Sequence, residues 1–443
     1  MKRDLTNGSI ISSLLAFSGP MILGNLLQQV YNIADTFIVG RFLGENALAA
    51  VGSTYTLTTF LYSIIIGLCM GCGSLVSYCF GERNERRLKG CLNISFLIIS
   101  SVTLVTELIT LCFSNGILKL LHTPMKIMSL TSDYVRIILS GIVFIFLYNF
   151  YSFMLRGVGN SLTPLILLGS SSVLNIILDF IFVADLDMGV KGAAYATVIS
   201  QAVSGVGLCV YTLAKEPLLR LSFKKKSWKD CSFGEVVRMS TAASVQQSVM
   251  NFGILMIQGL VNSFGTTVMA AFTVAVKIDT VAYMPAQEFG NAFSLFISQN
   301  YGAKKYDRIK TCVKYSFGIS AAFCVLISIL VAIFSNNLMG LFISDDKTEI
   351  IAVGSQYLVT EGSFYVGIGI LFLLYGYYRG INRPEIALVL TVISLGTRVA
   401  LAYFLSGFEA IGVFGIWISI PIGWVLADVV GIMYMNKKGR VTN

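Results

Sequence analysis

The chain has 443 residues, of which 55% are hydrophobic and only 12% are charged. Soluble domains carry about 25% charged residues, so this composition excludes an ordinary soluble protein and indicates a membrane protein. The net charge of +9 does not indicate nucleic-acid binding, because the basic residues lie in short gaps between apolar runs and form no basic stripe.

Apolar runs follow one another along the whole chain, separated by glycine, proline or charged residues. In the first half they lie near 10–40, 47–79, 90–113, 130–155, 162–184 and 190–214. In the second half they lie near 236–262, 267–299, 311–335, 350–378, 385–407 and 411–435. Because about 20 apolar residues cross a bilayer as a helix, the sequence predicts an all-α integral membrane protein with twelve transmembrane helices.

The basic residues predict which helix ends face the cytoplasm, because loops rich in Lys and Arg are retained inside. With the N-terminus inside, the inside segments hold 24 of the 32 basic residues and the outside segments hold six. The inside set includes the loop 81–89 and the stretch 215–238, with Lys224, Lys225 and Lys226. We therefore expect a multi-pass protein of the cell membrane whose N- and C-termini are both cytoplasmic.

An internal repeat appears when the chain is aligned with itself. The matched pairs include Tyr62 with Tyr283, Gly81 with Gly302, Cys91 with Cys312, and Tyr134 with Tyr357. The sequence predicts an N-lobe at 1–214, a cytoplasmic linker at 215–234 and a C-lobe at 235–443. Each lobe has an even number of helices, so the two are parallel repeats, an architecture typical of transporters that bind substrate between their halves.

The nine cysteines are scattered, and their spacing predicts no disulfide framework. Cys69 and Cys72 form a C-x-x-C pair, but without a second pair or a nearby histidine they do not indicate a metal site. The only histidine, His122, falls in a predicted loop. A membrane-embedded enzyme needs a set of catalytic residues, and the apolar runs contain no histidine and no set of metal ligands. We therefore expect no enzymatic activity and no cofactor.

Ionisable residues inside membrane helices are costly and indicate function. Asp35 in the first helix and Asp179 in the fifth each lie about five residues, roughly 8 Å, inside the outer ends of their helices. Asn175 precedes Asp179 by four residues on the same helix face, and Thr197 lies at a similar depth in the sixth helix. We therefore predict that these four side chains meet in the outer part of the first six helices.

This cluster suits a small cation. Carboxylate, amide and hydroxyl oxygens are hard ligands of the kind that bind Na⁺. Alternatively, two acids buried together favour a bound proton, because desolvation and like-charge repulsion oppose two negative charges. A purely structural hydrogen-bond cluster is the remaining alternative. The repeat argues against it, because the corresponding positions of the second half are Ile254, Arg398, Ala402 and Ile420.

Polar residues of the second half suggest contacts with a substrate. Lys277 in the eighth helix and Glu361 in the tenth lie near mid-membrane depth, where they are expected to pair or to touch the substrate. Asp279 lies two residues from Lys277 and so faces another direction. In the fourth helix, Tyr148 and Tyr151 are suited either to hold a lipophilic cation against their rings or to pack in the core.

Several short motifs resemble those of the multidrug and toxic compound extrusion (MATE) transporters, across essentially the whole chain. They are, in order, the helix from Pro20 to Asp35 with Gln28-Gln29 and Asn32-Ile33-Ala34-Asp35, then Arg156-Gly157-Val158-Gly159-Asn160, Gln299-Asn300-Tyr301-Gly302-Ala303 and Arg379-Gly380-Ile381-Asn382-Arg383-Pro384. Their order on a duplicated frame carries the resemblance.

The resemblance implies two six-helix lobes in a V around a central cavity, and antiport of organic cations against H⁺ or Na⁺. In some members the coupling site uses an Asp in helix 1, an Asn and an Asp in helix 5 and a Thr in helix 6. These positions match Asp35, Asn175, Asp179 and Thr197. The resemblance therefore implies that these residues couple transport to H⁺ or bind Na⁺.

Other members carry an acidic C-lobe site, for which helix 10 of this chain offers only Glu361, so coupling through the N-lobe is expected. Lys277 and Asp279 look more like the MepA-like branch of the family. The residues expected to line the substrate cavity are Gln28, Asn32, Tyr148, Tyr151, Lys277, Asp279 and Glu361.

These features predict a secondary active efflux transporter for cationic or amphipathic organic compounds, acting by alternating access as a monomer in the lipid bilayer. The nearest alternative is a flippase for lipid-linked saccharides, which shares the two-lobed plan. Such proteins line the cavity with several basic residues, whereas only Lys277 and Arg398 lie at cavity depth here. A channel is a further alternative, which accumulation of solute against a gradient excludes.

Overall fold

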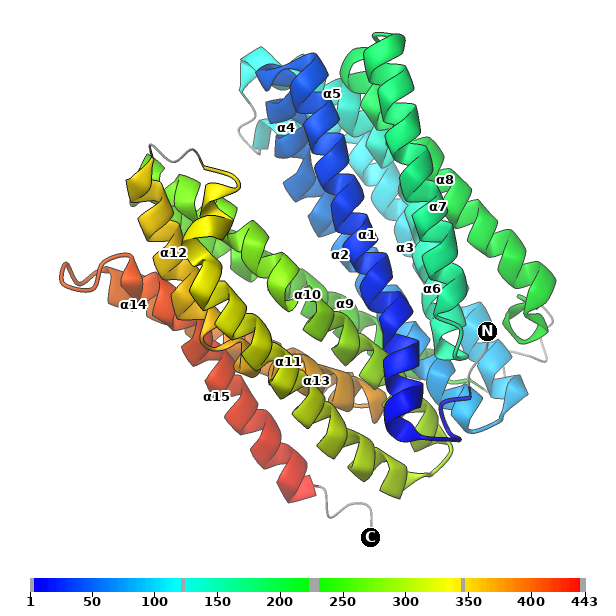
Figure 1. Ribbon diagram of the computed structural model, residues 1–443. Coiled ribbons are helices and arrows are strands. Elements are labelled where there is room, and N and C mark those ends of the chain that lie inside the picture. Colours follow the sequence, from blue (N-terminus) through cyan, green and yellow to red (C-terminus); the bar gives the residue numbers. More distant parts are fainter. Residues whose placement is uncertain (1–3, 121–123, 223–230, 344–346, 439–443) are drawn as a thin grey trace. The chain divides into compact units, whose positions relative to one another are not determined.

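The computed structural model of the protein describes residues 4–120, 124–222, 231–343 and 347–438. His122, Lys224, Lys225 and Lys226 lie outside these ranges. Within them the chain is helical and contains no β-strand. Figure 1 shows the helices in the order of the sequence.

The helices of the first half are α1 (Ile10–Leu43), α2 (Glu45–Gly81), α3 (Glu85–Cys112), α4 (Ser114–Leu120), α5 (Met125–Leu139), α6 (Ile142–Gly157), α7 (Leu162–Asp179) and α8 (Gly189–Lys215). A π-helical turn, η1 (Phe180–Asp185), continues α7, and a short 3-10 turn, η2 (Pro217–Leu219), follows α8. The helices of the second half are α9 (Phe233–Asn262), α10 (Thr266–Gly302), α11 (Tyr306–Gly340), α12 (Thr348–Gly362), α13 (Tyr365–Gly380), α14 (Pro384–Ser406) and α15 (Phe414–Lys438) (Figure 1).

Nine helices of the described ranges are long and apolar enough to cross a membrane, and eleven spans result if each of two bent pairs counts as one. The remaining predicted span coincides with α9, which has 30 residues. Gln246, Gln247 and Asn251 make α9 less apolar than its neighbours. The predicted all-α, multi-span membrane fold is confirmed, and a helix or a bent helix pair lies at each of the predicted spans.

Two predicted spans are broken at equivalent places in the two halves. The α5–α6 pair bends by 42° and the α12–α13 pair by 52°. Ser140 and Gly141 lie at the first break, and Gly362 and Ser363 lie at the second. Adjacent Gly and Ser residues weaken the helical hydrogen-bond ladder and are frequent at sharp kinks. Hydropathy alone predicted continuous helices here, because it does not sense such breaks.

The described chain groups into two compact units. Unit 1 contains Asp4 and the residues from Gly19 to Ser244, whereas unit 2 contains Leu5–Ser18 and the residues from Val245 onward. The start of α1 therefore groups with unit 2, and the start of α9 groups with unit 1. This grouping differs from the predicted lobe boundaries in the placement of these two helix starts.

The core of unit 1 lies where α2 packs against α3, α5 and α6, and where α6 packs against α8. Phe150 contacts Phe96 with ring centroids 5.3 Å apart and Phe146 with centroids 5.7 Å apart. Cys69 and Cys72 are fully buried in this core, where free cysteines act as small apolar side chains.

The core of unit 2 lies where α10 packs against α12 and α13, and where α14 packs against α15. Phe272 stacks on Trp417 with ring centroids 5.5 Å apart. Tyr357 meets the edge of Trp417 at 5.0 Å. These rings fix the face of α12 that carries Tyr357 and, one turn later, Glu361.

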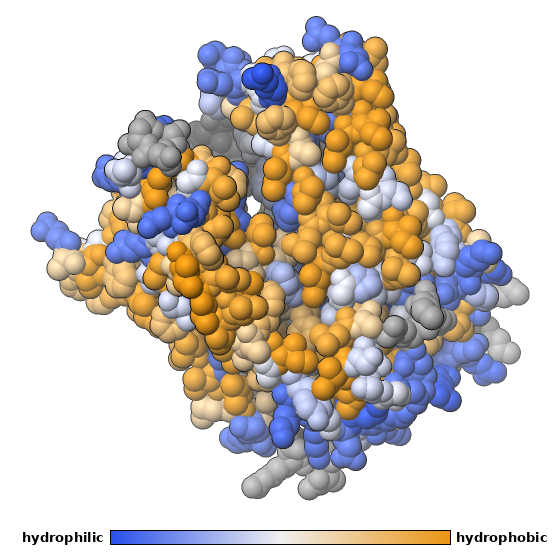
Figure 2. Space-filling model, in the orientation of Figure 1, coloured by the Kyte–Doolittle hydropathy of each residue, from blue (hydrophilic) through white to orange (hydrophobic). Residues whose placement is uncertain are grey.

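The outer surface of the helices is apolar. Phe37, Ile333 and Phe404 are 68%, 65% and 64% exposed. In Figure 2 hydrophobic residues cover the long sides of the helices, and hydrophilic residues gather near the helix ends. An aqueous surface rarely exposes so much contiguous apolar area, so this surface faces lipid and the protein is a multi-pass membrane protein.

A disulfide joins Cys91 in α3 to Cys231, which lies just before α9. The prediction that the cysteines imply no disulfide was therefore wrong. The two residues are 140 positions apart in the sequence, and the pairing depends on their proximity in space, which cysteine spacing alone does not reveal.

Candidate functional site

α1 lies along α7 within unit 1. A Cβ atom added at Gly24 would lie 3.6 Å from Leu165 Cδ1, which is an ordinary van der Waals distance, so the two helices are neighbours at this level. Further along both helices, the rings of Phe42 and Phe180 meet edge to face with centroids 5.6 Å apart. The two helices thus run in the same direction, which brings their acidic residues to the same level.

Asp35 on α1 and Asp179 at the end of α7 lie within electrostatic reach of one another. We call these two residues the unit 1 acid pair. Asp179 is fully buried, and Asn175, one turn earlier on the same face of α7, is 2% exposed. The structure therefore gathers three of the four residues of the predicted cluster.

The buried polar atoms of this cluster lack protein hydrogen-bond partners within the described residues. They are Asp35 Oδ1, both carboxylate oxygens of Asp179, and Asn175 Oδ1 and Nδ2. Ionised carboxylates accept hydrogen bonds but cannot donate them, so the unit 1 acid pair cannot satisfy itself. Either a proton held between the two acids or a small cation bound by their oxygens fits this donor set.

Thr197 lies on α8, which packs against α7. Its hydroxyl donates to the carbonyl of Ala193 at 3.0 Å, one turn back on its own helix, so only the acceptor capacity of the oxygen remains for a ligand. The π-helical turn of η1 begins directly after Asp179. Such turns are rare and recur at functional sites, and the hydropathy pattern gave no sign of this one.

Two tyrosines lie near the unit 1 acid pair and a third lies beside them, and sequence reasoning did not place any of the three there. Tyr31 and Tyr134 lie within electrostatic reach of both acids. Tyr62 interacts with Tyr31 and with the side chain of Gln201 on α8. The repeat contained a signal for two of them, because Tyr62 and Tyr134 both have tyrosine partners in the second half.

A second pair of buried acids lies in unit 2. Asp279 on α10 and Glu361 near the end of α12 are 3% and 2% exposed, and their carboxyl groups interact directly. We call them the unit 2 acid pair. The Tyr365 hydroxyl, at the start of α13, donates to Asp279 Oδ1 at 2.6 Å. The positions equivalent to the first cluster hold Ile254, Arg398, Ala402 and Ile420, and the second half brings two acids together from other helices instead.

Arg398 on α14 distinguishes the unit 2 acid pair from that of unit 1. The arginine is 8% exposed and lies within electrostatic reach of both acids. In the repeat it occupies the position that Asn175 has in unit 1. Tyr283 and Tyr357, the repeat partners of Tyr62 and Tyr134, lie within electrostatic reach of the unit 2 acid pair.

Lys277 does not join the unit 2 acid pair. Its side chain is exposed, and it forms no ion pair with any described residue. The predicted pairing of Lys277 with Glu361 is absent from the described part of the chain, and the carboxyl group of Asp279 lies beside Glu361 instead. The reason is the helical period, which turns residues two positions apart to different faces.

The other predicted cavity residues differ in their exposure. Gln28 is exposed and Asn32 half-buried, both on α1. Tyr148 is half-buried and its hydroxyl donates to the Pro164 carbonyl at 3.3 Å. Tyr151 is 1% exposed and belongs to the core of unit 1, so its ring is packed against protein and unavailable to a ligand.

A family model described as MatE matches residues 20–181 and 242–404, one segment in each half. "Probable multidrug resistance protein YpnP" of Bacillus subtilis (strain 168) is 30% identical, with 97% of this chain and 96% of the relative covered. "Probable multidrug resistance protein YoeA" of the same organism is 28% identical, with 98% and 96% covered. "Multidrug export protein MepA" of Staphylococcus aureus (strain MSSA476) is 23% identical, with 82% and 80% covered.

Solved structures have the same fold. A structure titled "Crystal structure of MATE in complex with MaL6" superposes with a TM-score of 0.92 at 23% identity, covering 99% of this chain and 98% of the other. An outward-facing multidrug resistance MATE transporter superposes with a TM-score of 0.90 at 24% identity, again covering 99% and 98%. Because the family model matches most of the chain in both halves, this chain belongs to the MatE family, the multidrug and toxic compound extrusion transporters.

Proposed function

We propose that this chain is a secondary active transporter that exports cationic or amphipathic organic compounds in exchange for H⁺ or Na⁺. The unit 1 acid pair carries the proposal, because its buried oxygens have no protein donor within the described residues. A contribution to stability does not explain why these two acids are buried together, since unpaired buried charge is destabilising. A role in ion coupling explains it, because the pair is stable only while it holds a cation.

The chain couples ion binding to movement through α1. Asp35 stands on α1, which contacts α7 through Gly24 and Phe42. Pro20 lies inside the same helix, where it removes one backbone hydrogen bond and allows bending. With a cation held, Asp35 and Asp179 attract one another through it and α1 stays against α7. Without it the two carboxylates repel, which favours another position of α1.

The unit 2 acid pair is suited to the charged group of the transported compound. Two carboxylates face one arginine, so the cluster of Asp279, Glu361 and Arg398 carries one unbalanced negative charge when both acids are ionised. A monovalent organic cation balances this charge.

The names of the relatives support this proposal, because the two Bacillus proteins are described as multidrug resistance proteins and MepA as a multidrug export protein. The proposal includes a monomer in the cell membrane with both termini in the cytoplasm. A flippase for lipid-linked saccharides has less support. Its substrate phosphates need several free basic residues, whereas of the two basic residues at cavity depth, Lys277 and Arg398, the buried Arg398 lies beside two acids.

Purified protein reconstituted in liposomes tests the proposal. A cationic dye is supplied, and a Na⁺ gradient or a pH gradient is imposed separately. We expect one gradient to drive accumulation of the dye against its own concentration gradient. Dye flux that only equilibrates under both gradients contradicts coupled transport and indicates a channel, and movement of a lipid-linked saccharide in place of the dye indicates a flippase.

A further inference from the structure

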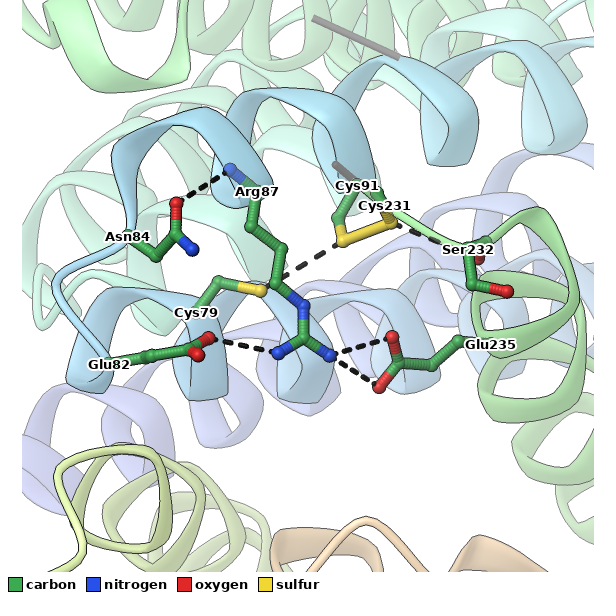
Figure 3. The surroundings of a disulfide bond; sticks show 8 residues. All are labelled: Cys79, Glu82, Asn84, Arg87, Cys91, Cys231, Ser232 and Glu235. Atoms are coloured by element: carbon green, nitrogen blue, oxygen red, sulfur yellow. Dashed lines mark hydrogen bonds and ion pairs between the residues drawn. A yellow bond between two sulfur atoms is a disulfide. The ribbon is translucent and has the colours of Figure 1, made fainter. Parts of the chain in front are cut away.

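Three cysteine sulfurs meet in unit 1, where α2 ends and α3 begins (Figure 3). Cys91 and Cys231 form the disulfide, with their Cα atoms 5.4 Å apart. The free thiol of Cys79 lies with its Sγ 3.9 Å from Cys91 Sγ. Exposure of these residues is 0%, 0% and 7% for Cys79, Cys91 and Cys231. Neither acid pair uses this cluster.

The disulfide ties the start of α9 to α3. Cys231 lies two residues before the first residue of α9, and the carbonyl of Ser232 accepts a hydrogen bond from the Glu235 amide at 3.1 Å. Arg87 on α3 binds both carboxylate oxygens of Glu235, at 2.8 and 2.9 Å (Figure 3). One covalent bond and one ion pair therefore hold the same turn.

The repeat supplies an internal control for this arrangement. Cys79 corresponds to Asn300 and Arg87 to Arg308. In unit 2, Asn300 Nδ2 donates to the Leu5 carbonyl at 3.2 Å, and Arg308 donates to the Gly8 carbonyl at 2.8 Å. Unit 2 thus holds the segment before α1 with hydrogen bonds alone.

Sulfur is therefore not required to hold such a segment. Cys312, the partner of Cys91 in the repeat, is a free thiol 3.7 Å from the Ser316 hydroxyl. Unit 1 differs in having a covalent bond and a thiol beside it. The loop 81–89 at this end is rich in basic residues and is predicted to be cytoplasmic, where disulfides are usually transient or redox-sensing.

We propose that Cys79, Cys91 and Cys231 form a thiol–disulfide exchange site that switches the start of α9 between a covalently tied and a released state. The Cys79 thiol gives up its proton, and its thiolate attacks Cys91 Sγ. The Cys79–Cys91 bond forms while the Cys91–Cys231 bond breaks, and the electron pair leaves on Cys231 Sγ, which takes up a proton. One disulfide is present before and after, so no oxidant is consumed.

A protease site inserted between Lys225 and Lys226 tests the tether in the full-length protein. Free thiols are blocked with a maleimide, the chain is cut, and the fragments are separated under denaturing conditions. We expect the wild type and Cys312→Ser to migrate as one species without reductant and as two with a dithiol. Cys91→Ser and Cys231→Ser are expected to separate without reductant. Separation of the wild type without reductant overturns the tether.

The exchange step is tested by mapping disulfide-linked peptides. In Cys231→Ser treated with a small-molecule disulfide, we expect a Cys79–Cys91 linkage, and its absence overturns the exchange. In the wild type a minor Cys79–Cys91 population is expected, and Cys79→Ser must abolish it while the tether persists. These readouts do not depend on the proposed transport activity.

Transport then tests the switch. The disulfide restricts the movement of α9. In the proposed transport cycle the helices must move at each turnover, so this restriction slows transport. We expect a dithiol to raise dye efflux by wild-type protein about twofold or more, and to leave Cys91→Ser unchanged. Efflux by the wild type that does not respond to the dithiol overturns the switch.

Discussion

The two acid pairs have related surroundings and different charges. Tyr134 in unit 1 and its repeat partner Tyr357 in unit 2 each lie within electrostatic reach of the local acids. The acids themselves come from non-equivalent helices, α1 and α7 in one unit and α10 and α12 in the other. Duplication therefore preserved the tyrosine frame, while the acids were placed separately in each half.

The difference in net charge suggests different tasks. The unit 1 acid pair has the neutral Asn175 where unit 2 has Arg398. Unit 2 thus contains its own cation, and unit 1 must obtain one from outside the protein. This contrast supports our proposal that unit 1 couples transport to an ion and that unit 2 contacts an organic cation, and each of the following variants tests one side of it.

The largest effect is expected for Asp179→Asn. The variant removes one of the two buried charges, so the pair no longer requires a cation. Gradient-driven dye efflux should fall about tenfold or more, equivalent to at least about 1.4 kcal/mol in the coupled step. Asp185→Asn, an exposed acid in the following π-helical turn, is the matched control and should retain efflux. Full efflux by Asp179→Asn at equal protein level rules out the coupling role.

Asn175→Arg gives unit 1 the charge arrangement of unit 2. The guanidinium would act as a permanent cation beside Asp35 and Asp179, so ion binding should no longer change the charge of the pair. We expect loss of gradient-driven accumulation with downhill dye flux retained, measured in liposomes. Asn175→Gln keeps a neutral amide and should remain coupled. Normal accumulation by Asn175→Arg would break the proposed contrast between the units.

Glu361→Gln should weaken substrate binding and leave coupling intact. Loss of one carboxylate leaves the unit 2 cluster with balanced charge, so an organic cation is no longer attracted. We expect the KM for a cationic dye to rise about tenfold while the imposed gradient still stimulates efflux. Glu349→Gln, an exposed acid in the first turn of α12, is the control. An unchanged KM with lost gradient dependence assigns coupling to unit 2 instead.

The smallest effect is expected for Tyr365→Phe. Its hydroxyl orients Asp279 through a 2.6 Å hydrogen bond, and hydrogen bonds to charged groups contribute about 1.5–3 kcal/mol. The midpoint of thermal unfolding of the purified protein should shift to a lower temperature. The KM for a cationic dye should rise only about two- to threefold. Tyr403→Phe, at a tyrosine that is 52% exposed, should change neither. Equal effects of the two variants contradict a role for the Asp279 contact.

Much of the fold could be predicted from the sequence, because membrane helices are recognised by their length and apolarity. The sequence did not predict the bends at Gly141 and Ser363 or the π-helical turn after Asp179. These features depend on a few backbone hydrogen bonds and leave the hydropathy unchanged. The disulfide also escaped prediction, because its two cysteines meet only in the folded chain.

The candidate sites were predictable to different degrees. Asp35 and Asp179 could be placed together because both helices run outward and both acids lie near the same depth. The unit 2 acid pair was missed because Lys277 offered an apparent partner for Glu361, and only the rotation of α10 decides which residue faces α12. Depth can be counted along a sequence, whereas helix rotation depends on packing.

The most direct test of the account measures one quantity in three proteins, the ratio of dye efflux with and without an imposed cation gradient. Wild type and Glu361→Gln should both show a ratio well above one, at saturating dye. Asp179→Asn should give a ratio of about one while still exchanging dye downhill. A ratio near one for Glu361→Gln together with a wild-type ratio for Asp179→Asn would contradict the assignment of ion coupling to the unit 1 acid pair.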